Sequence, residues 1–186
     1  MRLTAKVALL ATAWMFAAPA GAVVLGPFAG TWDVGDPTMP QRMFRDGSSS
    51  VCGSSKAAPG PFDGPNSYEI FPFQNAGAAD CVTLTQTSDF ETFLAVYLDS
   101  FDPTNLNMNY LGDMGSSGTG SAGIEIPADS EFLVVAMSVN GGSSLGHTFE
   151  FTVEGNNIAS VPEPATLALL GSALAGLGFS RRRKLH

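Results

Sequence analysis

Residues 131–139 read EFLVVAMSV, and this stretch decides the fold. Every residue from Phe132 to Ala136 is apolar, so both faces of an extended chain would be apolar there. Aromatic and β-branched residues favour strands, and a strand without a polar face belongs in the middle of a covered sheet. We therefore predict a central strand over residues 131–139, covered by a second sheet and by loops.

The next extended run, residues 147–153, has one apolar and one polar face. Thr148, Glu150 and Thr152 alternate with His147 and three apolar residues. Alternation with a period of two residues is typical of a strand that lies over a core with its other face in water. This run is therefore predicted to form a half-buried strand.

Shorter runs of β-branched and aromatic residues, bounded by turn formers, occur at similar spacing earlier in the chain. These further predicted strands are residues 68–71, 81–85, 92–98 and 123–126. No segment between residues 23 and 160 shows a sustained apolar period of 3.6 residues. A series of short strands joined by turns predicts an all-β fold, an antiparallel β-sandwich of the jelly-roll type.

The segment over residues 23–66 has a different character from the strand-rich part over residues 67–154. It is rich in Gly, Pro and Ser and has few apolar runs longer than two residues. Such a composition is typical of loops. We expect a loop-rich segment with one edge strand and one short helical turn.

The N-terminus has the layout of a secretory signal peptide. Arg2 and Lys6 precede an apolar run over residues 7–18, and Ala20-Gly21-Ala22 supplies the small residues that a signal peptidase requires. We predict cleavage after Ala22, which removes residues 1–22. The alternative is an uncleaved anchor helix, although the apolar run is shorter than a typical membrane-spanning helix.

The C-terminus has a second targeting layout. Pro162-Glu163-Pro164 leads into an apolar run over residues 165–179, and the basic cluster Arg181, Arg182, Arg183 and Lys184 follows. A helix over about residues 164–180 can just cross a bilayer, and a basic cluster after it stays in the cytoplasm. The chain body, about residues 23–160, would then lie outside the inner membrane as a single domain.

This order of a Pro-Glu-Pro tripeptide, an apolar helix and an Arg-rich tail closely resembles the PEP-CTERM sorting signal of Gram-negative bacteria. The resemblance covers residues 161–186. It implies recognition of Pro162-Glu163-Pro164 by an exosortase, a membrane-embedded cysteine transpeptidase that removes the tail. It also implies transient anchoring in the inner membrane, with residues 181–184 as the membrane stop, and delivery to the cell surface or extracellular matrix.

The predicted exported domain is strongly acidic. Its basic residues are Arg42, Arg45 and Lys56, against sixteen acidic residues, so its formal net charge is −13. A surface of this charge repels nucleic acid and anionic lipid and favours divalent cations and cationic partners. We therefore expect no nucleic-acid partner.

Cys52 and Cys81 both lie in the predicted exported domain. Two cysteines in an oxidising compartment most simply form a disulfide. The bond would close a loop over residues 53–80 that is rich in Gly, Pro, Ser and Asn. A zinc site is disfavoured because zinc takes about four ligands and this domain has a single histidine, His147.

Two stretches match the spacing of enzyme motifs, but their context argues against both. Residues 142–146 read GSSLG and satisfy Gly-x-Ser-x-Gly, yet a nucleophile elbow joins a strand to a helix and a strand follows here. We predict a Gly/Ser hairpin. Residues 118–123 read GTGSAG and also lead into a strand, so they predict a flexible loop instead of a dinucleotide site. The sequence assigns no catalytic residues.

Calcium is the one cofactor that the sequence suggests. Asp99, Asp102 and Asp113 lie in or just after the loop that follows residues 92–98, and calcium takes its oxygen ligands from such loops. The alternative is a solvated acidic loop in which Asp102 opens a turn.

Three aromatic residues near the same loop suggest a carbohydrate ligand. Tyr97, Phe101 and Tyr110 could stack on a sugar ring, which would suit a protein delivered into exopolysaccharide. The alternative is that these rings pack in the core or at the edge of a sheet.

A second resemblance covers residues 68–154. The order of the segments 89–97, 109–113, 123–127 and 132–136 is similar to that of the bacterial pre-peptidase C-terminal domain. This resemblance implies a sandwich that binds matrix or assists secretion, in some members with calcium at its edge. No peptidase accompanies it in this chain.

These observations indicate an exported, disulfide-stapled β-sandwich with a cleavable sorting tail. The expected role is non-enzymatic, as a surface or extracellular-matrix component in adhesion or assembly. Two alternatives remain open from the sequence: a carbohydrate- or calcium-binding module of the same fold, and a secreted hydrolase that uses a pair of carboxylates.

Overall fold

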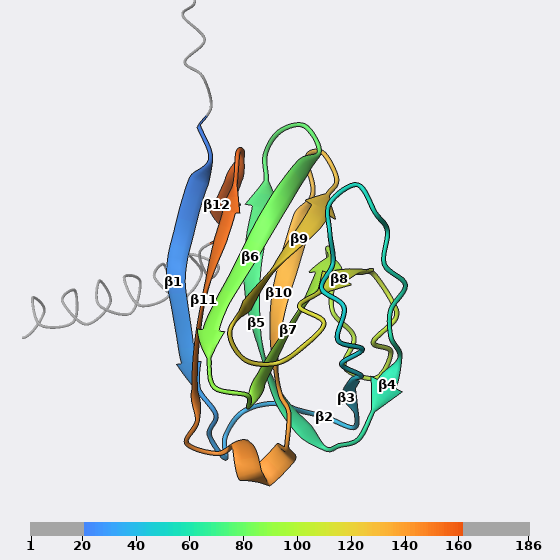
Figure 1. Ribbon diagram of the computed structural model, residues 1–186, viewed down its shortest axis with the longest axis vertical. Helices are drawn as coiled ribbons and strands as arrows, with labels where there is room; N and C mark the ends of the chain where they lie inside the picture. Colours follow the sequence, from blue (N-terminus) through green and yellow to red (C-terminus); the bar gives the residue numbers. More distant parts are fainter. Residues whose placement is uncertain (1–20, 162–186) are drawn as a thin grey trace, which may run out of the picture.

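The computed structural model describes residues 21–161, and these residues form two antiparallel sheets packed face to face as a β-sandwich (Figure 1). The first sheet has the order β1 (Val23–Thr31), β11 (Thr148–Gly155), β6 (Asp80–Ser88), β9 (Gly120–Ile126). The second has the order β12 (Ile158–Ser160), β5 (Asn66–Asn75), β10 (Glu131–Ser138), β7 (Thr92–Leu98), β8 (Tyr110–Asp113). The predicted all-β class and antiparallel pairing are confirmed.

Four short elements complete the described part of the chain. The strand β2 (Thr38–Met39) pairs with the start of β5, and β3 (Arg42–Met43) pairs with β4 (Pro61–Phe62). A 3₁₀ helix, η1 (Gly141–Ser144), connects β10 to β11. The helical turn predicted within residues 23–66 is wrong: this helix is the single helical element described, and it lies elsewhere.

The central strand of the second sheet is β10, as the sequence predicted. It pairs with β5 on one side and with β7 on the other, and Val134 lies opposite Phe71 and Val96. All of β10 from Val134 to Ser138 is buried. A strand paired on both edges and covered on both faces has no place for a charged side chain, which explains the continuous apolar run.

The strand β11 has the two-faced character that its alternation predicted. Phe149, Phe151 and Val153 are buried, whereas Thr148 and Glu150 are exposed. The buried rings meet aromatic residues of the opposite sheet; Phe151 lies 5.0 Å from Phe71, ring centroid to ring centroid, in an edge-to-face arrangement. The core of the sandwich is thus built from the inward faces of both sheets.

Consecutive strands often lie in opposite sheets, and this overturns the predicted hairpin over residues 142–146. The strand β10 belongs to the second sheet and β11 to the first, so η1 carries the chain across the end of the sandwich. The strand orders given above specify the connectivity, which the prediction of a jelly-roll type left open. The reason is tertiary: a Gly/Ser turn can serve a hairpin or a crossing between sheets, and local sequence does not distinguish them.

The flexible loop predicted over residues 118–123 is also wrong from Gly120 onward. Gly120 to Gly123 form the first half of β9 and pair with β6, with Ala122 opposite Leu84. A side chain at Gly123 would bring its Cβ within 3.1 Å of the Cys52 sulfur. Glycine occurs in this strand because another segment packs closely against it.

The N-terminal strand β1 is an edge strand of the first sheet, which confirms that part of the prediction for residues 23–66. Its register on β11 shifts between Leu25 and Phe28, around Pro27. Proline lacks an N–H donor and is therefore confined to edges and irregular positions of a sheet.

Candidate functional site

The last described strand, β12, ends at the predicted sorting motif. Ser160 lies opposite Phe73 of β5, and the next residue, Val161, donates its backbone N–H to the carbonyl oxygen of Pro72 at 3.1 Å. Pro162 follows directly, so no linker separates the hydrogen-bonded fold from the Pro-Glu-Pro motif. The motif itself, the basic cluster over residues 181–184 and the predicted helix over 164–180 lie outside the described residues.

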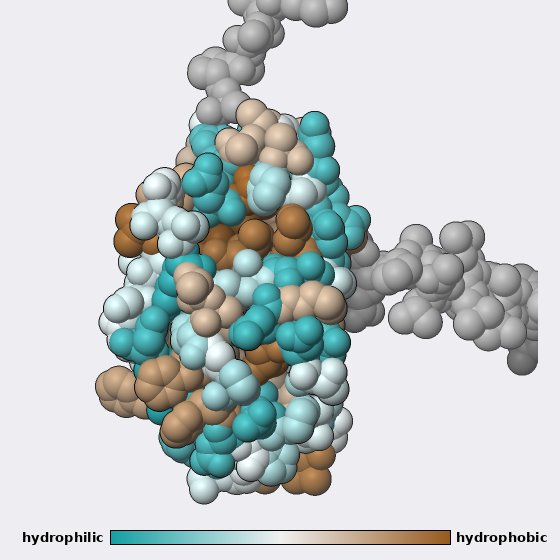
Figure 2. Space-filling view, turned by 90° about the vertical axis from the view of Figure 1, so that its right-hand side faces the viewer, coloured by the Kyte–Doolittle hydropathy of each residue, from teal (hydrophilic) through white to brown (hydrophobic). Residues whose placement is uncertain are grey.

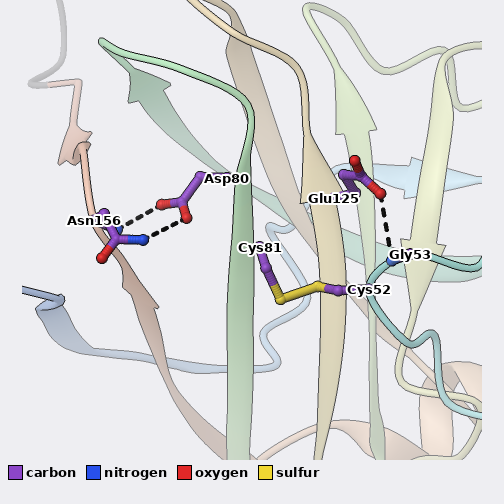
Figure 3. The surroundings of a disulfide bond; sticks show 6 residues. All are labelled: Cys52, Gly53, Asp80, Cys81, Glu125 and Asn156. Atoms are coloured by element: carbon purple, nitrogen blue, oxygen red, sulfur yellow. Dashed lines mark hydrogen bonds between the residues drawn. A yellow bond between two sulfur atoms is a disulfide. The ribbon is translucent and has the colours of Figure 1, made fainter.

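A buried carboxylate holds β12 in place. Asp80, at the start of β6, accepts hydrogen bonds from the backbone N–H of Asn156 at 2.5 Å and from its side-chain amide at 2.7 Å (Figure 3). Asn156 lies in the turn between β11 and β12. The turn that positions the sorting junction is therefore anchored to the first sheet by charge-assisted hydrogen bonds.

Cys52 and Cys81 form a disulfide, and their Cα atoms lie 5.7 Å apart. Figure 3 shows that Cys81 lies on β6 and Cys52 on a connecting segment outside the sheets. Next to the bond, the N–H of Gly53 donates to the Glu125 carboxylate of β9 at 3.3 Å. The predicted disulfide is thus present, and it attaches the loop-rich half of the domain to the first sheet.

The same segment is attached to the second sheet by an ion pair. Asp113, at the end of β8, is fully buried, and its carboxylate accepts from the Lys56 ammonium at 2.7 Å and from the Gly115 N–H at 2.5 Å. The Tyr110 hydroxyl donates to its second oxygen. Burial raises the pKa of Tyr110, and the hydrogen bond to Asp113 raises it further, so this phenol stays a donor at neutral pH.

The structure does not gather the three aspartates of the calcium hypothesis. The Asp113 carboxylate is engaged as above, and Asp102 accepts from the Thr104 N–H at 2.8 Å and its hydroxyl at 2.7 Å, as in a turn. Asp99 occupies a left-handed position directly after β7, with φ 57°. Within residues 21–161, no group of three or more His, Cys, Asp or Glu side chains could hold a metal ion. Calcium binding stays a prediction without a site.

The three aromatic residues of the sugar hypothesis pack against one another. Tyr97 is 0% exposed, and its ring centroid lies 4.8 Å from that of Phe101 and 6.1 Å from that of Tyr110. Tyr97 therefore cannot stack on a sugar, and that part of the hypothesis is wrong. Its strand, β7, is covered on both faces, so even the aromatic residue near its end points into the protein.

An exposed aromatic pair that the sequence did not single out lies on the side of β3 and β4. Phe44 and Phe62 are 42% and 43% exposed, their ring centroids are 5.3 Å apart, and the Arg42 guanidinium lies 4.7 Å from the Phe62 ring. Figure 2 faces this side of the molecule and shows apolar patches among hydrophilic residues. The two rings are eighteen positions apart in the sequence, so only the pairing of β3 with β4 reveals them.

The end of the sandwich near η1 contains a polar cluster that includes the Gly-x-Ser-x-Gly match. The buried Ser144 hydroxyl donates to the Glu91 carboxylate at 2.7 Å, and the Asn140 side-chain amide donates to the same carboxylate at 2.9 Å. His147 Nδ1 lies 2.5 Å from an Asp89 carboxylate oxygen. Among the hydrogen bonds of residues 21–161, none joins the Ser144 hydroxyl to the His147 ring, as a nucleophile and its base would require.

The charges of Asp89 and His147 stabilise each other although both side chains are solvent-exposed. The hydrogen bond between them, with Coulombic attraction, lowers the pKa of Asp89 and raises the pKa of His147. The pair therefore carries both charges over a wider pH range than the isolated groups would.

Comparison with known families identifies the C-terminus. Residues 160–184 match the model of the PEP-CTERM protein-sorting motif, which supports a PEP-CTERM protein. The motif implies a secreted protein that is exported, held by a C-terminal membrane anchor and processed by an exosortase. The match does not extend to the body, and its resemblance to the pre-peptidase domain is not confirmed. No curated protein and no solved structure matches the chain.

Neither predicted membrane segment falls within the described residues. Residues 1–20 of the predicted signal peptide and the helix over residues 164–180 lie outside them. Among residues 21–161 there is no helix of the length and apolarity that crossing a bilayer requires. The strand β1 begins at Val23, the first residue after the predicted signal-peptidase site.

The disulfide gives the first testable prediction. Replacing both cysteines, Cys52→Ser with Cys81→Ser, removes a cross-link between residues 29 positions apart and should lower the free energy of unfolding by about 3–4 kcal/mol in the chain-entropy model. Urea unfolding of the body with both ends removed measures the loss. The exposed neighbour Ser55→Ala is the control and should unfold like wild type; an equal midpoint for the double variant would contradict the prediction.

The ion pair of Asp89 and His147 predicts a pH-dependent stability. Because the pKa of His147 is raised, its contribution is full below the unfolded value of about 6.5 and is lost as pH rises through the folded pKa. The Asp89 contribution is present above about pH 4 and is lost as pH falls through its lowered pKa. The difference in melting temperature between wild type and His147→Gln should therefore be largest near pH 5 to 6 and shrink above it. Parallel curves from pH 5 to 8 would disprove the contribution of the pair.

Proposed function

We propose that the exported body is a non-enzymatic component of the cell surface or extracellular matrix, with a role in adhesion or assembly. The observation that carries this proposal is the sorting motif, which follows directly on a disulfide-stapled sandwich. The strongly acidic body favours solubility outside the cell and attraction to cationic partners or divalent cations. The resemblance of the tail to a Gram-negative sorting signal supports an exopolysaccharide-rich destination.

The side chains with catalytic potential support a non-enzymatic role. The Ser144 hydroxyl is buried against Glu91, and the His147 ring is paired with Asp89 at the surface. A nucleophile needs an adjacent base and an accessible reacting atom. In this arrangement each group stabilises the end of the sandwich instead.

The sorting step is tested by replacing Pro162-Glu163-Pro164 with three alanines. This change leaves the apolar run and the basic cluster intact, so the chain should still enter the membrane but should not be cut. We expect it to remain in the inner-membrane fraction with its tail attached, as the wild-type chain should in cells without exosortase. Fractionation followed by intact-mass measurement checks both points, and release of the alanine variant at the wild-type rate would refute exosortase sorting at this motif.

A second candidate function, carbohydrate binding, is favoured by the exposed pair of Phe44 and Phe62. A flat aromatic face packs well against the C–H face of a sugar ring, and a guanidinium beside it can donate to hydroxyl groups. Arg42 lies against the Phe62 ring, but it is 4% exposed, and two of its N–H groups, at Nε and Nη1, donate to the backbone oxygens of Val139 and Met43. The rings, rather than the arginine, would therefore carry the contact.

The carbohydrate hypothesis predicts retention of the purified body on immobilised native exopolysaccharide. Phe62→Ala should weaken binding at least about tenfold if the ring is an anchor. Phe90→Ala is the matched control, because Phe90 is 76% exposed and lies in the turn between β6 and β7, outside the pair of Phe44 and Phe62. Equal retention of wild type and both variants, at unchanged melting temperature, would exclude these rings as the sugar-binding site. If no protein is retained at all, the body does not bind this polysaccharide, and a matrix role would depend on protein partners.

A further inference from the structure

The outer edge of β5 is only partly covered. At one end β2 pairs with Asn66 and Ser67, and the Tyr68 N–H donates to the Pro37 oxygen at 3.0 Å. At the other end β12 pairs with residues 73–75, and Val161 adds its bond to the Pro72 oxygen. Between the two, Ile70 is 42% exposed.

The backbone of Ile70 faces this open edge. Along a strand, successive N–H and C=O groups point to alternate sides. The N–H groups of Ser67 and Asn75 point toward β10, where they donate to Ser138 and Ser130, whereas that of Tyr68 points to the outer edge. The register of β5 on β10 has no irregularity, so the backbone N–H and C=O of Ile70 point to the outer edge, as those of Tyr68 do. Within the described residues, its N–H and C=O have no backbone partner.

If the ladder of β12 on β5 continued, it would carry the sorting motif along this opening. Ala159 lies opposite Gln74 and Ser160 opposite Phe73, so Val161 follows opposite Pro72. Continued by two residues, the same ladder would bring Glu163 opposite Ile70. The N–H and C=O of Glu163 would then meet those of Ile70.

The two prolines of the motif have the phase that such an edge strand requires. Pro162 and Pro164 would lie opposite Phe71 and Glu69, positions at which an added strand turns its own N–H groups to solvent. Proline is tolerated in a sheet at edge positions of this kind because no ladder bond is lost. With a shift of one residue, both prolines would turn their ring nitrogens toward β5, where each lacks the N–H for a ladder bond and its ring crowds the β5 backbone.

The side-chain faces agree with this register. Phe71 of β5 points toward the core at the margin of the sandwich. Its half-buried ring has its centroid 6.0 Å from that of Phe28. Pro162 would extend this apolar cover, because residues opposite each other share a face. Glu163 would share the outer face with Ile70, so its carboxylate would stay in water.

We propose that Pro162-Glu163-Pro164 docks on the open edge of β5 as a continuation of β12 and is thereby shielded from the exosortase. A membrane transpeptidase needs the motif as a free segment, and β5 competes for the same backbone groups. Peeling of the motif from Ile70 then precedes processing, so the folded body sets the rate at which its own tail is cut. This inference rests on the sorting motif and is independent of the matrix role.

The direct test is hydrogen exchange of the Ile70 amide in the full chain, held in lipid nanodiscs. The matched variant carries one alanine inserted between Val161 and Pro162, which keeps the motif intact and reverses its phase. We expect the Ile70 amide to exchange about fivefold more slowly in wild type, the factor that corresponds to one net hydrogen bond. Equal exchange in both chains would overturn the inference. Protection that rises with protein concentration would also overturn it, because the occupant would then be a second copy.

The functional test is the processing rate in pulse–chase experiments. Ile70→Pro removes the N–H that faces the outer edge of β5 and breaks no hydrogen bond to β10. The strand already contains a proline, Pro72, whose nitrogen faces the same edge. Ile70→Pro and the alanine insertion should both speed tail removal by about the same fivefold factor, while Ile70→Val keeps the donor and should match wild type. Unchanged rates in both test variants would refute shielding. If Ile70→Pro fails to fold, the insertion decides alone.

Discussion

Ser50 bridges the two sheets between β8 and β9. Its N–H donates to the backbone oxygen of Asp113 at 2.9 Å, and its own backbone oxygen accepts from Gly123 at 2.9 Å. Asp113 ends β8 in one sheet and Gly123 lies in β9 of the other, so one residue joins both sheets at their edges. Ser50 thus covers part of two strand edges that could otherwise pair with other chains.

The disulfide and the buried ion pair keep Ser50 in this place. Cys52, two residues on, is bonded to β6, and Lys56 neutralises the carboxylate of Asp113, which would be costly to bury without a partner. Lys56 also donates to the Asp46 carboxylate at 2.8 Å and to the Ser48 oxygen at 2.5 Å. The segment between residues 46 and 56 therefore has a covalent tie to one sheet and an ionic tie to the other. A loop-rich half of an exported domain gains its order from these contacts rather than from its own propensity.

The opposite side of the sandwich carries both ends of the body. Edge strand β1 begins beside the predicted signal-peptidase site, and β12 ends one residue before the sorting motif. Both predicted cleavage regions thus adjoin a hydrogen-bonded strand. The strand β12, which covers part of the edge of β5, thus directly adjoins the predicted sorting motif.

The sequence by itself determined the all-β class, several of the strands, the disulfide partners and the sorting tail. The longest strand, β5, extends beyond its predicted range of residues 68–71 at both ends. Residues 92–98 form β7 as predicted, and β10 and β11 differ from their predicted ranges by one or two residues, because strong apolar patterns report burial directly. The short strand β12 was missed, and β8 was suggested only by the resemblance over residues 109–113, since Gly112, Asp113 and Ser160 have no strand propensity of their own. Only the tertiary structure decided which sheet each strand joins, that Tyr97 points inward, that Asp113 binds Lys56 instead of gathering with Asp99, and that Phe44 meets Phe62. These outcomes depend on contacts between residues far apart in the chain, and no local pattern encodes them.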